Sequence, residues 1–388
     1  MARRPSPTPS AGRLGALDGL RGLAAVGIVA VHVWMFVLGD GGRPERTGVD
    51  VLISQLRLAV PLFFVLSGFL IFRPFAAAAL EGRPAPPLVP YALRRVARIV
   101  PAYWVAILGS AVLLAWIGHP QAITVRELPS FLLFLQNYDA TTVGGLNPPS
   151  WTVVVEVSFY AAVPLAGLAA TRFCRGRAPR TRRRALAAAC LALIATGAIL
   201  FALSKLHAWP KTAIYTLPLQ LAAFGAGMLV AVLVHDRRAG IRTTVPLALG
   251  GLLLVVLDGW WHGTTAGPLI LRQLGNDLPA TLGFALIVGA IAVGPLPGSA
   301  ALARGPLEYL GRISFGLYLW HFPMIYLLRE SERFPTTLLA ALCLTLALSL
   351  TLAMLSWHLI ERPALERARR AIARRRRRTA RLPAVVRD

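Results

Sequence analysis

Residues 17–38 read LDGLRGLAAVGIVAVHVWMFVL, an apolar run long enough to cross a membrane as one helix. The run also carries Asp18, Arg21 and His32, and an ionisable side chain inside a bilayer costs about 2.5–3.5 kcal/mol on insertion scales. Arg21 and His32 are eleven residues apart, so they return to within about 20° of one helix face and differ by about 16 Å in height. This segment therefore predicts a cation near one membrane surface and an imidazole near the other, on one face.

A structural explanation of these residues stays open. Asp18 and Arg21 stand three positions apart and can pair at the start of the helix. His32 can be a packing histidine whose hydrogen bonds are satisfied. The other ionisable residues of the chain are needed to distinguish a structural role of these three side chains from a catalytic or binding role.

The composition is that of a membrane protein. Of the 388 residues 56% are hydrophobic and only 15% are charged, and the mean hydropathy is +0.61. The net charge of +24 would suggest nucleic acid in a soluble protein, but here the arginines lie between long apolar runs, so we expect no nucleic-acid partner. The three cysteines have neither metal-ligand spacing nor a disulfide framework, and we expect no metal site.

Apolar segments long enough to span a bilayer predict an all-α, polytopic bundle of about ten transmembrane helices. The segments are residues 17–38, 58–80, 99–118, 151–170, 185–204, 214–234, 243–262, 277–296, 313–330 and 336–360. Arginines concentrate in alternate connections, and both ends of the chain fall on the arginine-rich side. The positive-inside rule therefore predicts that both termini are cytoplasmic.

One membrane domain is predicted over residues 16–363, after a disordered basic arm at 1–15 and before a basic cytoplasmic tail at 364–388 that rests on anionic lipid. No removable signal peptide and no internal repeat are expected. The outer connection 119–150 breaks the simple pattern, because its apolar stretch Leu128–Tyr138 is too short to span. We expect a surface-lying or re-entrant helix there, in a long loop of the kind that often covers a site.

Arginines also gather within or beside the predicted spans. Arg73 lies near the inner end of 58–80, where its side chain can snorkel to the surface. Arg94, Arg95 and Arg98 cluster just before 99–118, near the level of Arg21. Membrane topology alone explains such a cluster, and so does a phosphate site, because guanidinium groups bind phosphate bidentately.

Glu156 lies five residues inside the outer end of its span, about 7 Å down, and His32 lies six residues, about 9 Å, from the outer end of its own. At similar depth, a carboxylate that orients an imidazole makes it a better base. A protonated structural carboxyl is the alternative for Glu156.

The ninth span carries a polar stripe, because Ser314, Tyr318 and His321 follow i, i+4, i+7 and share a face. Such a stripe is either hydrogen-bonding glue between helices or part of a site. Glu361 and Arg362 close the last span, where we expect an interfacial pair.

These residues predict two layers, a cationic inner layer around Arg21 and an acid–base outer layer of His32 and Glu156, with His321 nearby. The arrangement suits a long anionic cofactor whose phosphates stay at the cytoplasmic face while its reactive end reaches into the membrane.

From about Ala16 to Pro363 the sequence resembles the integral-membrane acyltransferase family three, O-acyltransferases that modify bacterial surface glycans and some glycosylated natural products. The motifs that carry the resemblance are LDGLRGLAAVGIVAVHVW, PLFFVLSGFLI, RRVARIVPAYW, WTVVVEVSFY, SFGLYLWHFP and IERP. They give Arg21 and His32, then Arg94, Arg95 and Arg98, then Trp151 and Glu156, and finally Ser314, Tyr318, His321 and Glu361. Thr152 stands where the family usually has serine.

The resemblance implies an acyl-CoA donor substrate on the cytoplasmic side, no tightly bound cofactor, and a hydroxyl acceptor, commonly on a sugar. His32 would be the general base, with Glu156 as its orienting group, or would carry a transient acyl group. Arg21, Arg94, Arg95 and Arg98 would hold the donor phosphates. A proton-coupled transporter or flippase, or a non-catalytic scaffold, would use the same ionisable groups differently.

Overall fold

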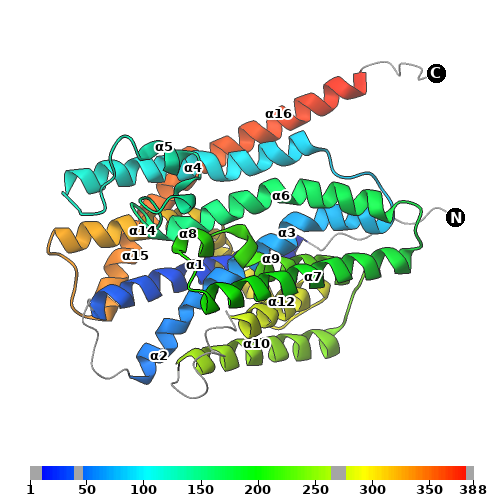
Figure 1. Cartoon of the computed structure of the whole chain (residues 1–388), viewed down its shortest axis with the longest axis horizontal. Helices are drawn as coiled ribbons and strands as arrows, with labels where there is room; N and C mark the ends of the chain where they lie inside the picture. Colours follow the sequence, from blue (N-terminus) through cyan, green and yellow to red (C-terminus); the bar gives the residue numbers. More distant parts are fainter. Residues whose placement is uncertain (1–10, 39–46, 264–276, 382–388) are drawn as a thin grey trace.

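The computed structural model describes residues 11–38, 47–263 and 277–381, and within these ranges it contains helices, turns and loops but no strand (Figure 1). The long helices are α1 (Ala11–Leu38), α3 (Ala59–Glu81), α4 (Leu88–Trp116), α6 (Trp151–Cys174), α7 (Pro179–Leu206), α9 (Leu217–Leu233), α10 (Ile241–Gly263), α12 (Leu278–Val293), α14 (Gly305–Glu330), α15 (Leu338–Ser356) and α16 (Arg362–Arg381). Short elements join them: α2 (Gly48–Ser54), η1 (Gln55–Leu58), α5 (Leu128–Leu132), η2 (Gln136–Tyr138), η3 (Pro148–Ser150), α8 (Lys211–Ile214), α13 (Ser299–Leu302) and the π-helical turn η4 (Trp357–Glu361).

The predicted all-α membrane bundle is confirmed. Within the described part of the chain, 8 helices are long and apolar enough to cross a membrane. Each of the ten predicted spans coincides with one long helix, and the two outside the eight are α12, which has 16 residues, and α14, which carries several charged side chains.

Two helices begin earlier than predicted. Helix α1 begins at Ala11, inside the predicted arm. Residues 1–10 of that arm lie outside the described residues. Helix α4 begins at Leu88, so Arg94, Arg95 and Arg98 lie within the helix and not before it. Pro90 fits there because the first N–H groups of a helix have no intrahelical acceptor.

The predicted solvated tail is a helix through Arg381, continuous with α15 through η4 (Figure 1). Helix α16 packs along α4 and buries Ala368 and Ile372. Arg367, Arg370, Arg374 and Arg377 are exposed. The tail is therefore an amphipathic helix in the described residues, while residues 382–388 lie outside them.

Helices α1 and α14 pack closely and run in the same direction, because Asp18 meets Gly311 toward one end and His32 meets His321 toward the other. A Cβ atom at Gly311 would lie 2.1 Å from the carbonyl oxygen of Asp18, so only glycine permits this approach. The contact fixes the height of the α1 residues relative to the polar stripe of α14.

The long connection between α4 and α6 turns back into the bundle, as the re-entrant alternative predicted. Phe131, Gln136, Asn137, Leu146 and Asn147 are all buried. Asn137 Nδ2 donates to the carbonyl oxygens of Trp151 and Tyr215, and Asn147 Nδ2 donates to that of Leu319 at 2.8 Å. These bonds begin α6 inside the bundle and not at its surface.

Candidate active site

Two imidazoles from helices far apart in sequence form the centre of the site. His32 Nδ1 on α1 lies 2.8 Å from His321 Nε2 on α14, and the two rings are nearly parallel, with 10° between their planes. His321 is fully buried, whereas His32 is half-buried. Phe322 meets the His32 ring edge-on, with the ring centres 5.1 Å apart.

The hydrogen bonds assign the tautomers of this pair. His321 Nδ1 lies 2.7 Å from the carbonyl oxygen of Tyr318, which can only accept, so Nδ1 carries the hydrogen. A neutral His321 then has its lone pair on Nε2 and accepts from His32 Nδ1. His32 is left with a lone pair on Nε2, which is the state of a base.

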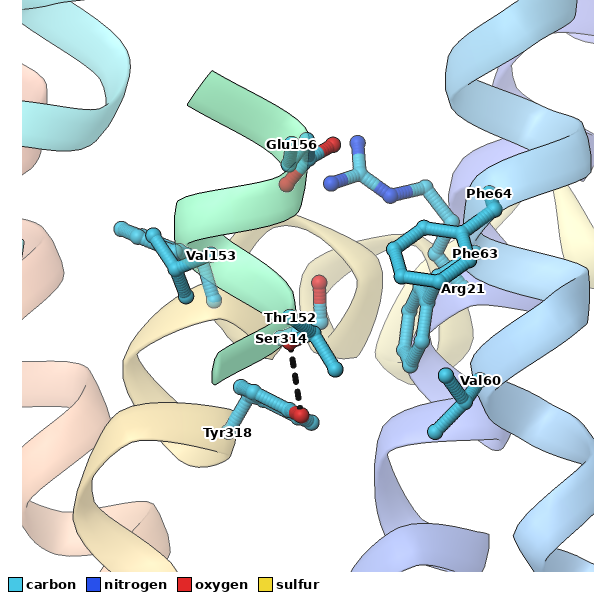
Figure 2. A pocket seen from close by; sticks show the side chains of 10 residues that line it. Arg21, Val60, Phe63, Phe64, Thr152, Val153, Glu156, Ser314 and Tyr318 are labelled. Atoms are coloured by element: carbon cyan, nitrogen blue, oxygen red, sulfur yellow. Dashed lines mark hydrogen bonds between the residues drawn. The ribbon is translucent and has the colours of Figure 1, made fainter. Parts of the chain in front are cut away.

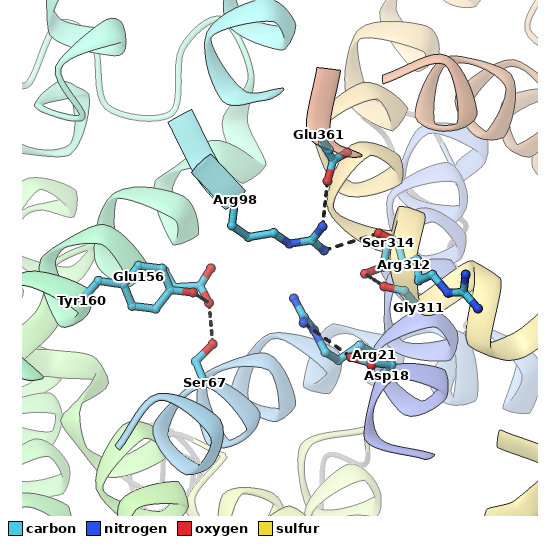
Figure 3. Close-up of polar contacts among 10 residues, drawn as sticks. All are labelled: Asp18, Arg21, Ser67, Arg98, Glu156, Tyr160, Gly311, Arg312, Ser314 and Glu361. Carbon is cyan, nitrogen blue, oxygen red and sulfur yellow. Dashed lines mark hydrogen bonds and ion pairs between the residues drawn. The ribbon is translucent and has the colours of Figure 1, made fainter. Parts of the chain in front are cut away.

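The predicted pairing of Glu156 with His32 is not formed among the described residues. Glu156 Oε1 accepts a hydrogen bond from the Tyr160 hydroxyl at 2.5 Å and a short one from Ser67 Oγ (Figure 3). His321, which the sequence placed only nearby, takes the orienting position that we had given to Glu156.

The error has a physical cause in the height of α6. The predicted depth of Glu156 assumes that its span begins at the membrane surface, but the connection 119–150 starts α6 at Trp151 inside the bundle. The Tyr318 hydroxyl donates to the carbonyl oxygen of Pro149 at 2.9 Å and lies 2.8 Å from Thr152 Oγ1. Glu156 is one helical turn further along α6 and so lies beside Arg21, in the layer that we predicted to be purely cationic (Figure 3).

A small cavity lies between these groups (Figure 2). Its polar walls are Arg21, Thr152, Glu156, Ser314 and Tyr318, and its apolar walls are Val60, Phe63, Phe64, Val153 and Phe315. Arg21 and Glu156 face each other at one end, and Tyr318 lies toward the other (Figure 2). His321 follows Tyr318 by one turn of α14, so the histidine pair lies just beyond the Tyr318 end.

Arg98 of α4 forms a buried ion pair with Glu361 of η4. Its Nη1 donates to Glu361 Oε2 at 2.9 Å, and Nη2 donates to the Arg312 carbonyl oxygen at 3.4 Å (Figure 3). The predicted pair of Glu361 with Arg362 is therefore wrong, and Arg362 bonds to Glu366 instead. The π-helical turn η4 inserts an extra residue into the turn, which rotates Glu361 toward the bundle.

Of the remaining predicted site residues, Ser314 lines the cavity, whereas Arg94, Arg95 and Trp151 are not among its lining residues. The Arg95 guanidinium lies 5.6 Å from the centre of the Tyr160 ring, whereas Arg94 is an exposed residue of α4. Ser314 lines the cavity and donates to the Gly311 carbonyl oxygen at 2.8 Å. Trp151 stacks on Tyr215, with ring centres 4.5 Å apart, and so supports the start of α6.

Sequence reasoning missed Ser67 and Tyr160, the two partners of Glu156. Tyr160 had a signal, because it follows Glu156 by four residues and shares its helix face. Ser67 had none, since its contact joins α3 to α6 across 89 positions of sequence.

Two groups of carboxylates with a histidine lie outside this cavity, Glu81 with His235 and Asp236, and Asp258 with His262 and Asp277. An arginine pairs with a carboxylate of each, Arg83 with Glu81 and Arg57 with Asp277. We interpret both groups as ion-pair networks.

The fold and site define a polytopic membrane protein with an acid–base pair and an arginine-lined cavity inside its helical bundle. Residues 14–358 match the family model described as an acyltransferase domain, and the chain therefore belongs to this acyltransferase family. No solved structure matches the chain significantly.

Three curated relatives align along most of the chain. Acyltransferase MdmB of Streptomyces mycarofaciens is 27% identical over 337 residues, which cover 82% of this chain and 80% of that protein. YrhL of Bacillus subtilis (strain 168), named as a candidate peptidoglycan O-acetyltransferase, is 24% identical over 386 residues, covering 92% of this chain but 56% of its own length. BcsY of Komagataeibacter xylinus, named as a candidate membrane-bound transacylase, is 26% identical over 369 residues, covering 92% and 84%. The chain thus spans little more than half of YrhL.

Proposed function

We propose that this protein transfers an acyl group from acyl-CoA to a hydroxyl of a sugar-containing acceptor, a glycosylated metabolite or an envelope glycan. Family membership supports acyl transfer, and the name of YrhL, a candidate peptidoglycan O-acetyltransferase, supports an oxygen acceptor of this kind. The observation that carries the proposal is the histidine pair, because its hydrogen bonds leave His32 Nε2 as an oriented base beside a cavity.

In the proposed reaction, His32 Nε2 removes the proton from the acceptor hydroxyl as its oxygen attacks the thioester carbonyl. The new C–O bond forms, the C–S bond breaks, and the imidazolium returns its proton to the leaving thiolate. His321 accepts from His32 Nδ1 throughout and stabilises the imidazolium, while the Tyr318 carbonyl holds the His321 ring. His32 is the catalytic residue, and His321 positions it.

The donor would enter from the arginine-rich end of the bundle, which we define by the connections 82–87, 175–178 and 234–240 and propose to be cytoplasmic, together with both termini. Arg21 and Arg95 would meet the donor phosphates, with Arg94 at the entrance. Arg98 contributes less free charge than the sequence suggested, because Glu361 already neutralises it. Glu156 would position the Arg21 side of the cavity.

The acceptor would reach His32 from the opposite end or from within the membrane. The connection 119–150 folds compactly into the bundle, with Leu146 and Asn147 buried, which favours a small or lipid-linked acceptor over a long polymer.

The proposal is tested by a transfer assay, in which purified protein is incubated with radiolabelled acyl-CoA and an extract of glycans and metabolites from the cells that produce the protein. We expect label to move to an extract component with wild type, and His32→Ala to lower the rate about 10²–10⁴-fold. Transport without transfer, or a His32→Ala variant that folds and transfers at the wild-type rate, would overturn it. Mass spectrometry of cells with and without the protein identifies the acceptor by the lost acyl increment.

A further inference from the structure

A second cavity lies at the arginine-rich end of the bundle. Its walls come from the ends of α3 and α9, the connection 82–87 and the connection after α9. Four arginines line it: Arg73, Arg83, Arg237 and Arg238. Pro84, Pro86 and Pro87 form a rigid apolar rim.

The charge of this cavity is positive. Glu81 is an ion-pair partner of Arg83, and Asp236 Oδ2 lies 2.9 Å from His235 Nε2. Burial holds the pKa of His235 below its ordinary value although Asp236 and Glu81 act to raise it. With His235 neutral, the cavity is lined by four arginines and two carboxylates, so its net charge is positive. The side chains of Arg237 and Arg238 are exposed to solvent and line the cavity.

One face of α3 connects this cavity to the active site. Val60 and Phe63 line the catalytic cavity, and Ser67 holds Glu156. Leu70, Pro74 and Ala77, which line the second cavity, continue the same spacing of three and four residues. From Ala77 to Val60 the helix rises about 26 Å, and residues lining the two cavities follow one another along this length of α3.

We propose that this second cavity binds the adenosine end of the acyl-CoA donor through its 3′-phosphate, while the diphosphate and the thioester arm extend along α3 toward Arg21 and His32. The inference rests on the proposed function. Guanidinium groups recognise phosphate in charge-assisted, often bidentate pairs, and Arg237 and Arg238 stand where a large anion can reach them. Arg98 cannot supply this charge, because a buried carboxylate already pairs with it.

A lipid headgroup is the other source of phosphate at such a position. The volume of the cavity, about 600 Å³, is sufficient for a nucleotide, because sites for small molecules typically measure about 300–1,000 Å³. The path along α3 favours the nucleotide, since a lipid has no need of a route to the histidine pair.

The test compares the binding of CoA with that of dephospho-CoA, which lacks only the 3′-phosphate, to detergent-purified full-length protein by calorimetry. We expect wild type to bind CoA about tenfold or more tightly, as loss of a charge-assisted hydrogen bond implies. Arg237→Gln/Arg238→Gln should lose this preference. Arg180→Gln/Arg184→Gln, which removes the same charge from exposed positions of α7 outside the cavity, should keep it.

Three outcomes would overturn the assignment. Wild type could bind both compounds equally, or the Arg237/Arg238 variant could keep the preference for CoA. Alternatively, phosphatidylglycerol in nanodiscs could compete with CoA in wild type while the variant loses lipid binding alone, which assigns the cavity to lipid. Transfer of labelled acyl groups is measured in parallel. If wild-type protein is active and gives any of these three results, the assignment of the cavity is wrong but the proposed function stands. If wild-type protein neither binds CoA nor transfers the acyl group, both the assignment and the proposed function are wrong.

Discussion

The Arg98 guanidinium on α4 and the Glu361 carboxylate in η4 form an ion pair of 2.9 Å that is almost completely withdrawn from solvent, with 18% and 0% of the two side chains exposed. It joins positions 263 residues apart and ties the C-terminal helix to the wall of the site. Arg98 also lies over the rings of Phe315 and Trp357. The pair therefore has a structural role that competes with the donor-binding role expected of Arg98.

Glu361→Gln should destabilise the protein strongly, because it leaves the Arg98 cation buried without a counter-charge. We expect the free energy of unfolding to fall by about 3–5 kcal/mol, measured by denaturant unfolding in detergent. Glu366→Gln is the matched control, because its partner Arg362 is exposed and such pairs contribute about 0–1 kcal/mol. Equal effects of the two variants would contradict a structural role for Glu361.

His321→Ala should lower kcat by about 10²–10⁴-fold and leave the KM for acyl-CoA nearly unchanged. Without its acceptor, the His32 ring loses both its fixed tautomer and its orientation. His119→Ala removes another imidazole, one that contacts the Tyr326 ring and lies outside the pair, and should leave kcat near the wild-type value. If both variants lowered kcat equally, the pairing would have no special role.

Tyr160→Phe and Ser67→Ala each remove one hydrogen bond to Glu156 Oε1. A bond to a charged group contributes about 1.5–3 kcal/mol, and we expect each variant to lose stability in this range. Because both bonds end on one oxygen, each single variant leaves that oxygen one donor and the double variant leaves it none, so the double variant should lose more than the sum of the two. Ser158→Ala on the same helix is a control, because its hydroxyl bonds to a backbone carbonyl of α6. Strict additivity would show that the two bonds act independently.

The connection 119–150 should loosen in acid. Backbone and hydroxyl hydrogen bonds from Thr141 hold the pKa of Asp139 below its ordinary value, so the folded turn favours the carboxylate. This contribution is present above the unfolded pKa of about 3.9 and is lost as the pH falls through the lower folded value. Amide hydrogen exchange, corrected for its intrinsic pH dependence, should show less protection of residues 139–143 at pH 3 than at pH 6. Asp139→Asn should remove the difference, and persistence of the difference in that variant would assign it elsewhere.

The sequence alone determined which segments form helices and how far apart, along the helix axis, two residues of the same helix lie. Apolar runs of bilayer length are a local property, and the regular rise of a helix places Arg21 and His32 on one face without knowledge of any neighbour. The same regularity grouped Ser314, Tyr318 and His321 correctly. The motifs were sufficient for the family, which the match over residues 14–358 confirms.

Only the tertiary structure decided which residues meet. His32 pairs with His321 and not with Glu156, because the close approach of α1 to Gly311 sets the register of α14. Glu156 lies beside Arg21 because Asn137 and Asn147 anchor a loop that starts α6 inside the bundle. Glu361 turns inward because one π-helical turn shifts its direction. Each of these depends on packing between distant segments, and helical periodicity in one segment contains no information about the register of another.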